Sequence, residues 1–204
     1  SIADGVVTTL NSDGFDKFYL SLGEIVYING TTMVTSVDIE KDNGVIHVID
    51  RTLMPPMQTV VDIAVALSTA DDAEFTTLVA LLTDPVQSAV LEAISDEDGN
   101  FTIFAPTDAA FDEISEVTAT LTDEQISEVL KYHVVPGRIF STDLSDGIMP
   151  ETVSTQTVEV NIDDNGVTLI DKDGTNEDAT VIQVNIHGIN GVIHVIDKVL
   201  IPTL

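Results

Sequence analysis

The chain has 204 residues, of which 35 are acidic and 7 basic, so its formal charge is −28. Because 44% of the residues are hydrophobic, the chain can form a packed core, which excludes a disordered polyelectrolyte. The charge excludes nucleic acid and anionic lipid as partners, and the absence of Cys excludes disulfides, thiolate metal sites and a Cys nucleophile. The sequence contains no apolar run near the roughly 20 residues of a membrane span, so we expect membrane contact only through an anchor upstream of Ser1.

Short apolar or alternating runs, separated by turn residues, dominate the first quarter of the chain. This pattern predicts strands. The expected strands are Phe18–Leu22, Glu24–Ile28, Met33–Ile39 and Val45–Ile49.

Helical signals dominate the next part of the chain. Thr59 precedes an apolar run, and Thr122 and Gln125 form a capping box. The expected helices are Val60–Leu67, a turn carrying Phe75, Leu78, Val79 and Leu82, Val86–Ile94 after Asp84-Pro85, a short helix from Thr107 to Ile114, and Asp123–His133. Strands are expected at Phe101–Phe104, Thr157–Ile162, Val167–Ile170, Thr180–Ile186 and Val192–Ile196.

An internal repeat organises these elements. Residues 43–55 read NGVIHVIDRTLMP and residues 190–202 read NGVIHVIDKVLIP, 147 positions later. Both faces of the repeated strand are apolar, which predicts a central strand covered on both sides. We therefore expect a complete α+β unit at 57–204, with helices first and strands second, and the closing half of an earlier unit at 1–56.

Three segments of the later unit carry a family resemblance. They are FTIFAPTDAAF at 101–111, Tyr132-His133, and the closing NGVIHVIDKVLIP. Together they resemble the fasciclin-like (FAS1) domain. The resemblance implies a wedge-shaped β-sandwich with flanking helices, used in tandem copies outside the cell, at the cell surface or in the periplasm. It further implies adhesion through contacts with surface or matrix proteins.

The resemblance also implies adhesive residues. Tyr132, His133, Val134 and Val135 match a segment implicated in adhesive contacts, and Asp38-Ile39 matches a second adhesive pair. The later unit has Asn185-Ile186 in place of this pair. The helical pattern places His133 on an apolar face, where a hydrogen-bonded core histidine is the alternative. Both interpretations hold if His133 fixes the segment and Tyr132 is exposed.

Other residues of the matching segments favour structural roles. Pro106 cannot continue a strand, Thr107 can cap a helix, and Asp108 would lie in its first turn. His47 and His194 occupy equivalent strand positions, which favours an architectural role in both copies. The expected structural set is Phe104, Pro106, Thr107, Asp108, His194, Asp197, His47 and Asp50.

Acidic turns at 96–100, 163–165 and 171–178 raise the alternative of an exported ligand-binding or calcium-binding protein. None follows the EF-hand pattern, and hairpin turns favour Asp, Asn and Gly for backbone reasons alone. The sequence contains no GxSxG, HExxH, Walker or GxGxxG motif. We therefore expect no catalysis, no cofactor and no metal site.

This expected division of the chain leaves the strands of residues 1–56 without the helices that cover their counterparts in residues 57–204. An uncovered sheet exposes apolar side chains and edges. We expect it to be covered by an opening half in a longer chain or by a second copy in a dimer. Packing on the chain's own later unit is the less favoured alternative.

Overall fold

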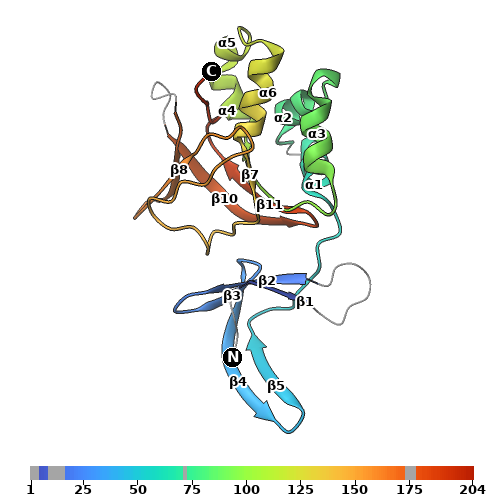
Figure 1. Ribbon diagram of the computed structural model, residues 1–204, viewed down its shortest axis with the longest axis vertical. Helices are drawn as coiled ribbons and strands as arrows, with labels where there is room; N and C mark the ends of the chain where they lie inside the picture. Colours follow the sequence, from blue (N-terminus) through green and yellow to red (C-terminus); the bar gives the residue numbers. More distant parts are fainter. Residues whose placement is uncertain (1–4, 9–16, 71–72, 173–177) are drawn as a thin grey trace.

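The computed structural model describes residues 5–8, 17–70, 73–172 and 178–204, which form two separate sheets (Figure 1). The first sheet is antiparallel, and its strands follow the chain order: β1 (Gly5–Thr8), β2 (Lys17–Leu22), β3 (Val26–Ile28), β4 (Thr32–Lys41) and β5 (Gly44–Ile49). Turn residues separate these strands as expected, with Asn29 and Gly30 at positive φ between β3 and β4.

The second sheet has the order β7-β6-β11-β10-β9-β8. Its strands are β6 (Phe101–Pro106), β7 (Val134–Pro136), β8 (Glu159–Asp163), β9 (Gly166–Ile170), β10 (Ala179–Gly188) and β11 (Gly191–Ile196). Only β6 and β11 pair in parallel among the described strands, with Ile103 opposite Ile193. Parallel neighbours need a long connection, and a segment that contains helices and four further strands separates β6 from β11 in the chain.

The helices precede most of the second sheet in the chain. They are α1 (Val60–Ser68), α2 (Thr76–Leu82), η1 (Pro85–Gln87), α3 (Ser88–Ser95), α4 (Asp108–Glu113), α5 (Ser115–Thr118) and α6 (Asp123–Tyr132). The hydroxyl groups of Thr59, Thr107 and Thr122 accept backbone hydrogen bonds at the starts of α1, α4 and α6. These caps confirm the predicted helix starts.

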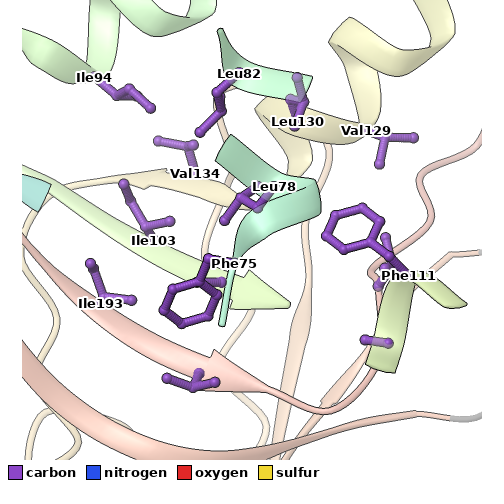
Figure 2. Close-up of a cluster of buried hydrophobic side chains, with 14 of the residues drawn as sticks. Phe75, Leu78, Leu82, Ile94, Ile103, Phe111, Val129, Leu130, Val134 and Ile193 are labelled. Atoms are coloured by element: carbon purple, nitrogen blue, oxygen red, sulfur yellow. The ribbon is translucent and has the colours of Figure 1, made fainter. Parts of the chain in front are cut away.

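A first core lies between the helices and one face of the second sheet. Figure 2 shows Phe75 and Leu78 beside Ile103 and Ile193, which come from β6 and β11. Each of the four side chains is buried. The helices therefore bury the face of β11 that carries Ile193 and Val195.

A second core lies on the other face of the same sheet. Every strand of this sheet contributes a buried side chain to it: Phe104, Val135, Val160, Leu169, Ala179 and Ile196. Side chains from six neighbouring strands can meet in one cluster only if the sheet curls around it. The α+β architecture of a curled sheet flanked by helices confirms the predicted fold class.

The two repeated hairpins have the same register. In β4–β5, Val34 lies opposite Ile49 and Ile39 opposite Ile46, with two register shifts between them. In β10–β11, the pairs 147 positions later are Val181 with Ile196 and Ile186 with Ile193, with the same shifts. The duplicated sequence therefore specifies the same backbone in two different surroundings.

A small junction joins the two sheets. The Asn185 Nδ2–H donates to the Gly30 carbonyl at 3.0 Å, and the Thr142 hydroxyl donates to the Ser21 hydroxyl at 2.9 Å. The Arg138 guanidinium lies 4.5 Å from the centroid of the Tyr19 ring, a cation–π geometry. This junction involves the β2–β3 end of the first sheet, whereas the β4–β5 hairpin points away from the second sheet (Figure 1).

Some elements differ from the predicted ones. The helix expected from Val86 begins as the 3₁₀ turn η1, because Asp84 caps Val86 and Pro85 opens a tighter turn. Strands β1 and β7 and helix α5 were not predicted, since each has at most four residues. Among the described helices, none is long and apolar enough alone to cross a membrane. A pair bent by 67°, α2 with η1–α3, passes that test by length and composition only.

Candidate functional site

The structure buries the segment from Tyr132 to Val135. Tyr132 has no exposed surface, and the other three side chains are at most 4% exposed. The Tyr132 hydroxyl donates to the Thr157 carbonyl at 2.9 Å, and burial together with the Asp171 charge raises its pKa to about 12. The expectation of an exposed Tyr132 is therefore wrong, because its hydroxyl finds a carbonyl partner inside the second core.

His133 is buried and hydrogen-bonded, as the core interpretation predicted. It follows the last residue of α6, its Nδ1–H donates to the Val129 carbonyl at 2.7 Å, and its Nε2 accepts from the Leu200 N–H at 2.9 Å. Burial lowers the pKa of the imidazole to about 4, against the opposing effect of the Val129 carbonyl. A neutral His133 thus ties the end of α6 to the closing segment of the chain.

Residues of the turn after β6 accept hydrogen bonds from the starts of two helices. Thr107 caps α4, and Phe104 and Pro106 are buried at the end of β6. The Asp108 carboxylate accepts from the Thr76 N–H at 3.0 Å and from the Thr77 N–H at 2.8 Å. Burial raises the pKa of Asp108, but the hydrogen bonds from these threonines outweigh that effect and lower it.

Asp108 therefore caps α2, a role that the sequence pattern did not indicate. The residue before α2, Phe75, has a left-handed backbone (φ 67°) and makes no side-chain cap. A carboxylate 32 positions later in the chain satisfies the helix start instead. The only signal was an acidic residue in the FAPTD turn, and its partner depends on the tertiary fold.

The repeated histidines have different surroundings. His194 is fully buried, as the prediction of a strand covered on both sides requires, and its Nε2–H donates to the Ile139 carbonyl at 2.9 Å. His47 is partly exposed, and its Nδ1 accepts from the Asp38 N–H at 3.2 Å. The two copies therefore share a backbone position but not the same hydrogen bonds.

The repeated aspartates do have the same contacts. The Asp197 carboxylate accepts from the Thr180 N–H at 2.6 Å, and the Asp50 carboxylate accepts from the Met33 N–H at 2.9 Å. Each aspartate closes the open end of its hairpin through a main-chain bond to the same partner as well. The geometry thus supports a structural role for Asp50 and Asp197.

Asn190 is a buried structural residue that the sequence analysis missed. Its Oδ1 accepts from the Val60 N–H at 3.0 Å, and its Nδ2 donates to the carbonyls of Ile94 and Asp96, both at 2.9 Å. One side chain thus joins the start of α1 to the end of α3. The pair Asn190-Gly191 indicates only a turn, because Asn-Gly is common in hairpins.

The second predicted adhesive pair is accessible. Asp38 and Ile39 lie on β4, where Asp38 is exposed at φ 55° and Ile39 is 37% exposed. The equivalent Asn185 has φ 62° but lies in the junction, bonded to Gly30 and Ser141. Of the residues predicted to bind partners, Asp38 and Ile39 are the ones that the structure presents to solvent.

Comparison with known proteins identifies the family. The family model of the fasciclin domain matches residues 2–55 and 73–202. The chain belongs to the fasciclin family. Human periostin is 33% identical over 196 residues, covering 91% of this chain but 22% of periostin. Protein sll1483 of Synechocystis is 33% identical over 163 residues, covering 77% of this chain and 81% of that protein.

A solved structure of a FAS1 domain pair from the insect cell adhesion molecule Fasciclin I has the same fold. The TM-score is 0.56 at 19% identity, and the match covers 92% of this chain and 67% of that pair. The fasciclin chain described here thus spans about a fifth of periostin and two thirds of the domain pair.

An apolar cavity of about 240 Å³ lies among α2, α4, α5 and α6. Its lining is apolar apart from Ser115, Thr118 and His133, and both ring nitrogens of His133 are already bonded. Among the residues that the structure describes, no three His, Asp or Glu side chains are placed to hold a metal ion. The acidic turn at 171–178 lies partly outside the described residues.

Proposed function

We propose that this chain is an extracellular module for cell adhesion or for contact with surface or matrix proteins, acting by protein–protein contacts rather than by catalysis. The observation that carries the proposal is the fasciclin match over both parts of the chain. It is supported by the fold shared with a domain pair from an insect cell adhesion molecule.

We further propose that residues 1–56 are the closing half of one fasciclin unit and residues 57–204 a complete unit. The common register of the β4–β5 and β10–β11 hairpins supports this division. Each unit then presents a different surface, because the second adhesive pair is exposed on β4 and its counterpart on β10 lies in the junction.

The adhesive contact is proposed to centre on Asp38 and Ile39. An exposed strand position with a carboxylate beside an apolar side chain offers both a charge and a contact surface to a partner. The segment from Tyr132 to Val135 has a supporting role in this proposal, since its side chains are buried and hold α6 against the sheet.

An attachment assay tests the proposal. The chain is immobilised, and the adhesion of cells and of purified matrix proteins is compared for the parent, for Asp38→Ala with Ile39→Ala, and for the control Ile182→Ala. Ile182 is a strand isoleucine on β10 and is 56% exposed. Attachment should fall for the double variant and not for the control, with unchanged melting temperatures. Equal attachment by all three would contradict this surface, and no attachment by the parent would contradict the adhesive function.

A further inference from the structure

The apolar face of α6 borders a hollow in the helical layer. Four residues at helical spacing on α6 and its C-terminal cap line the 240 Å³ cavity: Ile126, Val129, Leu130 and His133. Leu78 of α2 and Phe111 of α4 line it as well, and Figure 2 shows these two side chains with Val129 and Leu130. Protein interiors are close-packed, with few voids larger than a water molecule. The side chains around this hollow therefore lack contacts on one side, which an occupant would supply.

The polar side chains of the lining have already used their hydrogen-bond donors. The Ser115 hydroxyl donates to the Asp112 carbonyl at 2.9 Å, and the Thr118 hydroxyl donates to the Ser115 carbonyl at 3.0 Å. Both ring nitrogens of His133 are bonded to main-chain groups. A cavity retains water when two to four polar partners are available to each molecule. The lining of this cavity thus favours an apolar occupant over water.

The volume of the cavity indicates the size of its ligand. A cavity of about 150 Å³ lined by Leu, Ile and Phe side chains stays dry and binds benzene. The cavity beside α6 has about 240 Å³ and a lining of the same kind, rich in Leu, Ile, Val and Phe. It is therefore large enough for a hydrocarbon-like molecule of about two fused rings.

The charges at the mouth of the cavity favour an uncharged ligand. Ser115 begins α5 and Ala119 follows it, and both are exposed residues of the lining, so the opening lies beside α5. Asp112 and Glu116 are exposed next to them, in a chain with a formal charge of −28. Carboxylates at an opening repel anions. A fatty acid or another organic acid is thus disfavoured relative to an uncharged molecule of the same size.

We propose that this cavity is a binding site for an uncharged, apolar small molecule of one or two rings, which enters beside α5. Apolar burial and dispersion contacts with α2, α4 and α6 would supply the binding free energy. The site lies among the helices of the later unit, whereas Asp38 and Ile39 lie on β4. The inference therefore goes beyond the adhesive function and does not depend on it.

A calorimetric titration of the full chain with naphthalene tests the proposal. Naphthoate is the matched anion, because it has the same two rings and one carboxylate in addition. We expect naphthalene to saturate at one molecule per chain and naphthoate to bind more weakly by roughly tenfold or more. Naphthalene should also raise the melting temperature, since a ligand that binds only the folded state stabilises it.

Two variants locate the binding. Ala119→Phe places a ring at the mouth of the cavity and should weaken naphthalene binding by roughly tenfold or more, while the chain still folds because the position is exposed. Ala80→Phe on α2 is the matched control, at an exposed alanine outside the lining, and should bind naphthalene as the parent does. If Ala119→Phe does not fold, Ala119→Leu applies the same test with a smaller side chain.

Three results would overturn the proposal. The first is a titration of the parent in which naphthalene does not saturate at one site. The second is an equal or higher affinity for naphthoate. The third is unchanged naphthalene binding by the folded Ala119 variant, because the molecule would then bind elsewhere on the chain.

Discussion

Replacing Asn190 with alanine should destabilise the complete unit far more than the same change at Asn43. The Asn190 side chain makes three hydrogen bonds, to Val60, Ile94 and Asp96, at 2.9 to 3.0 Å. At about 1 kcal/mol net for each bond, and with a helix start and a helix end left unpaired, the cost should be about 3 to 5 kcal/mol. For a domain of this size, that corresponds to a fall in melting temperature of roughly 6 to 20 °C.

Asn43→Ala is the matched control, because the seven residues that follow are the same and the side chain is exposed. Its cost should stay within about 0.5 kcal/mol. Calorimetry on the parent and on both variants measures the difference. If Asn190→Ala melts within 2 °C of Asn43→Ala, or if both variants lose the same stability, the assignment of Asn190 as the residue that joins α1 to α3 is refuted.

Asp108→Ala should lower the free energy of unfolding, measured by chemical denaturation, by about 1 to 2 kcal/mol because α2 loses its cap. The control Asp112→Ala, which like Asp108 lies on α4, should change it by less than about 0.5 kcal/mol, and equal losses for the two variants would contradict the cap. The pKa of His133 is about 4 in the folded protein and about 6.5 in the unfolded chain, so the unfolded state binds more protons between these pH values. As pH falls from 6.5 to 4, the free energy of unfolding of the parent should therefore fall by about 3 kcal/mol more than that of His133→Gln. Parallel pH curves for the two proteins would show that His133 does not titrate in this way. The melting temperature should rise or stay constant as sodium chloride approaches about 1 M, because salt screens the repulsion between like charges. The formal charge is −28, whereas the described residues form three ion pairs, so repulsion should outweigh attraction. A clear fall in melting temperature would mean that the attractive pairs dominate.

The local features of the fold could be predicted from the sequence. The 147-residue repeat predicted two equivalent hairpins, and their registers agree pair by pair. The caps at Thr59, Thr107 and Thr122 were predicted because a cap joins residues two or three positions apart. Interactions over such short separations are visible in a single sequence.

The roles that could not be predicted depend on partners that are distant in the sequence. Tyr132 was expected at the surface, but its hydroxyl bonds to Thr157, 25 positions later. Asp108 caps a helix 32 positions earlier, and Asn190 accepts from Val60, 130 positions earlier. A polar side chain gives no sign in the sequence of which buried main-chain group it will satisfy, so these roles required the structure.

The Asn185 amide has a consequence for how repeated units diversify. The Nδ2–H of Asn185 donates to Gly30, and its Oδ1 accepts from the Ser141 N–H at 2.9 Å. An aspartate at this position, as at the equivalent Asp38, would keep the acceptor and lose the donor, so its second oxygen would face the Gly30 carbonyl. Exchanging this nitrogen for an oxygen would thus remove one hydrogen bond between the two sheets and put a repulsive contact in its place. In a chain of several such units, the residue at this position would therefore help to set how firmly one unit holds the next.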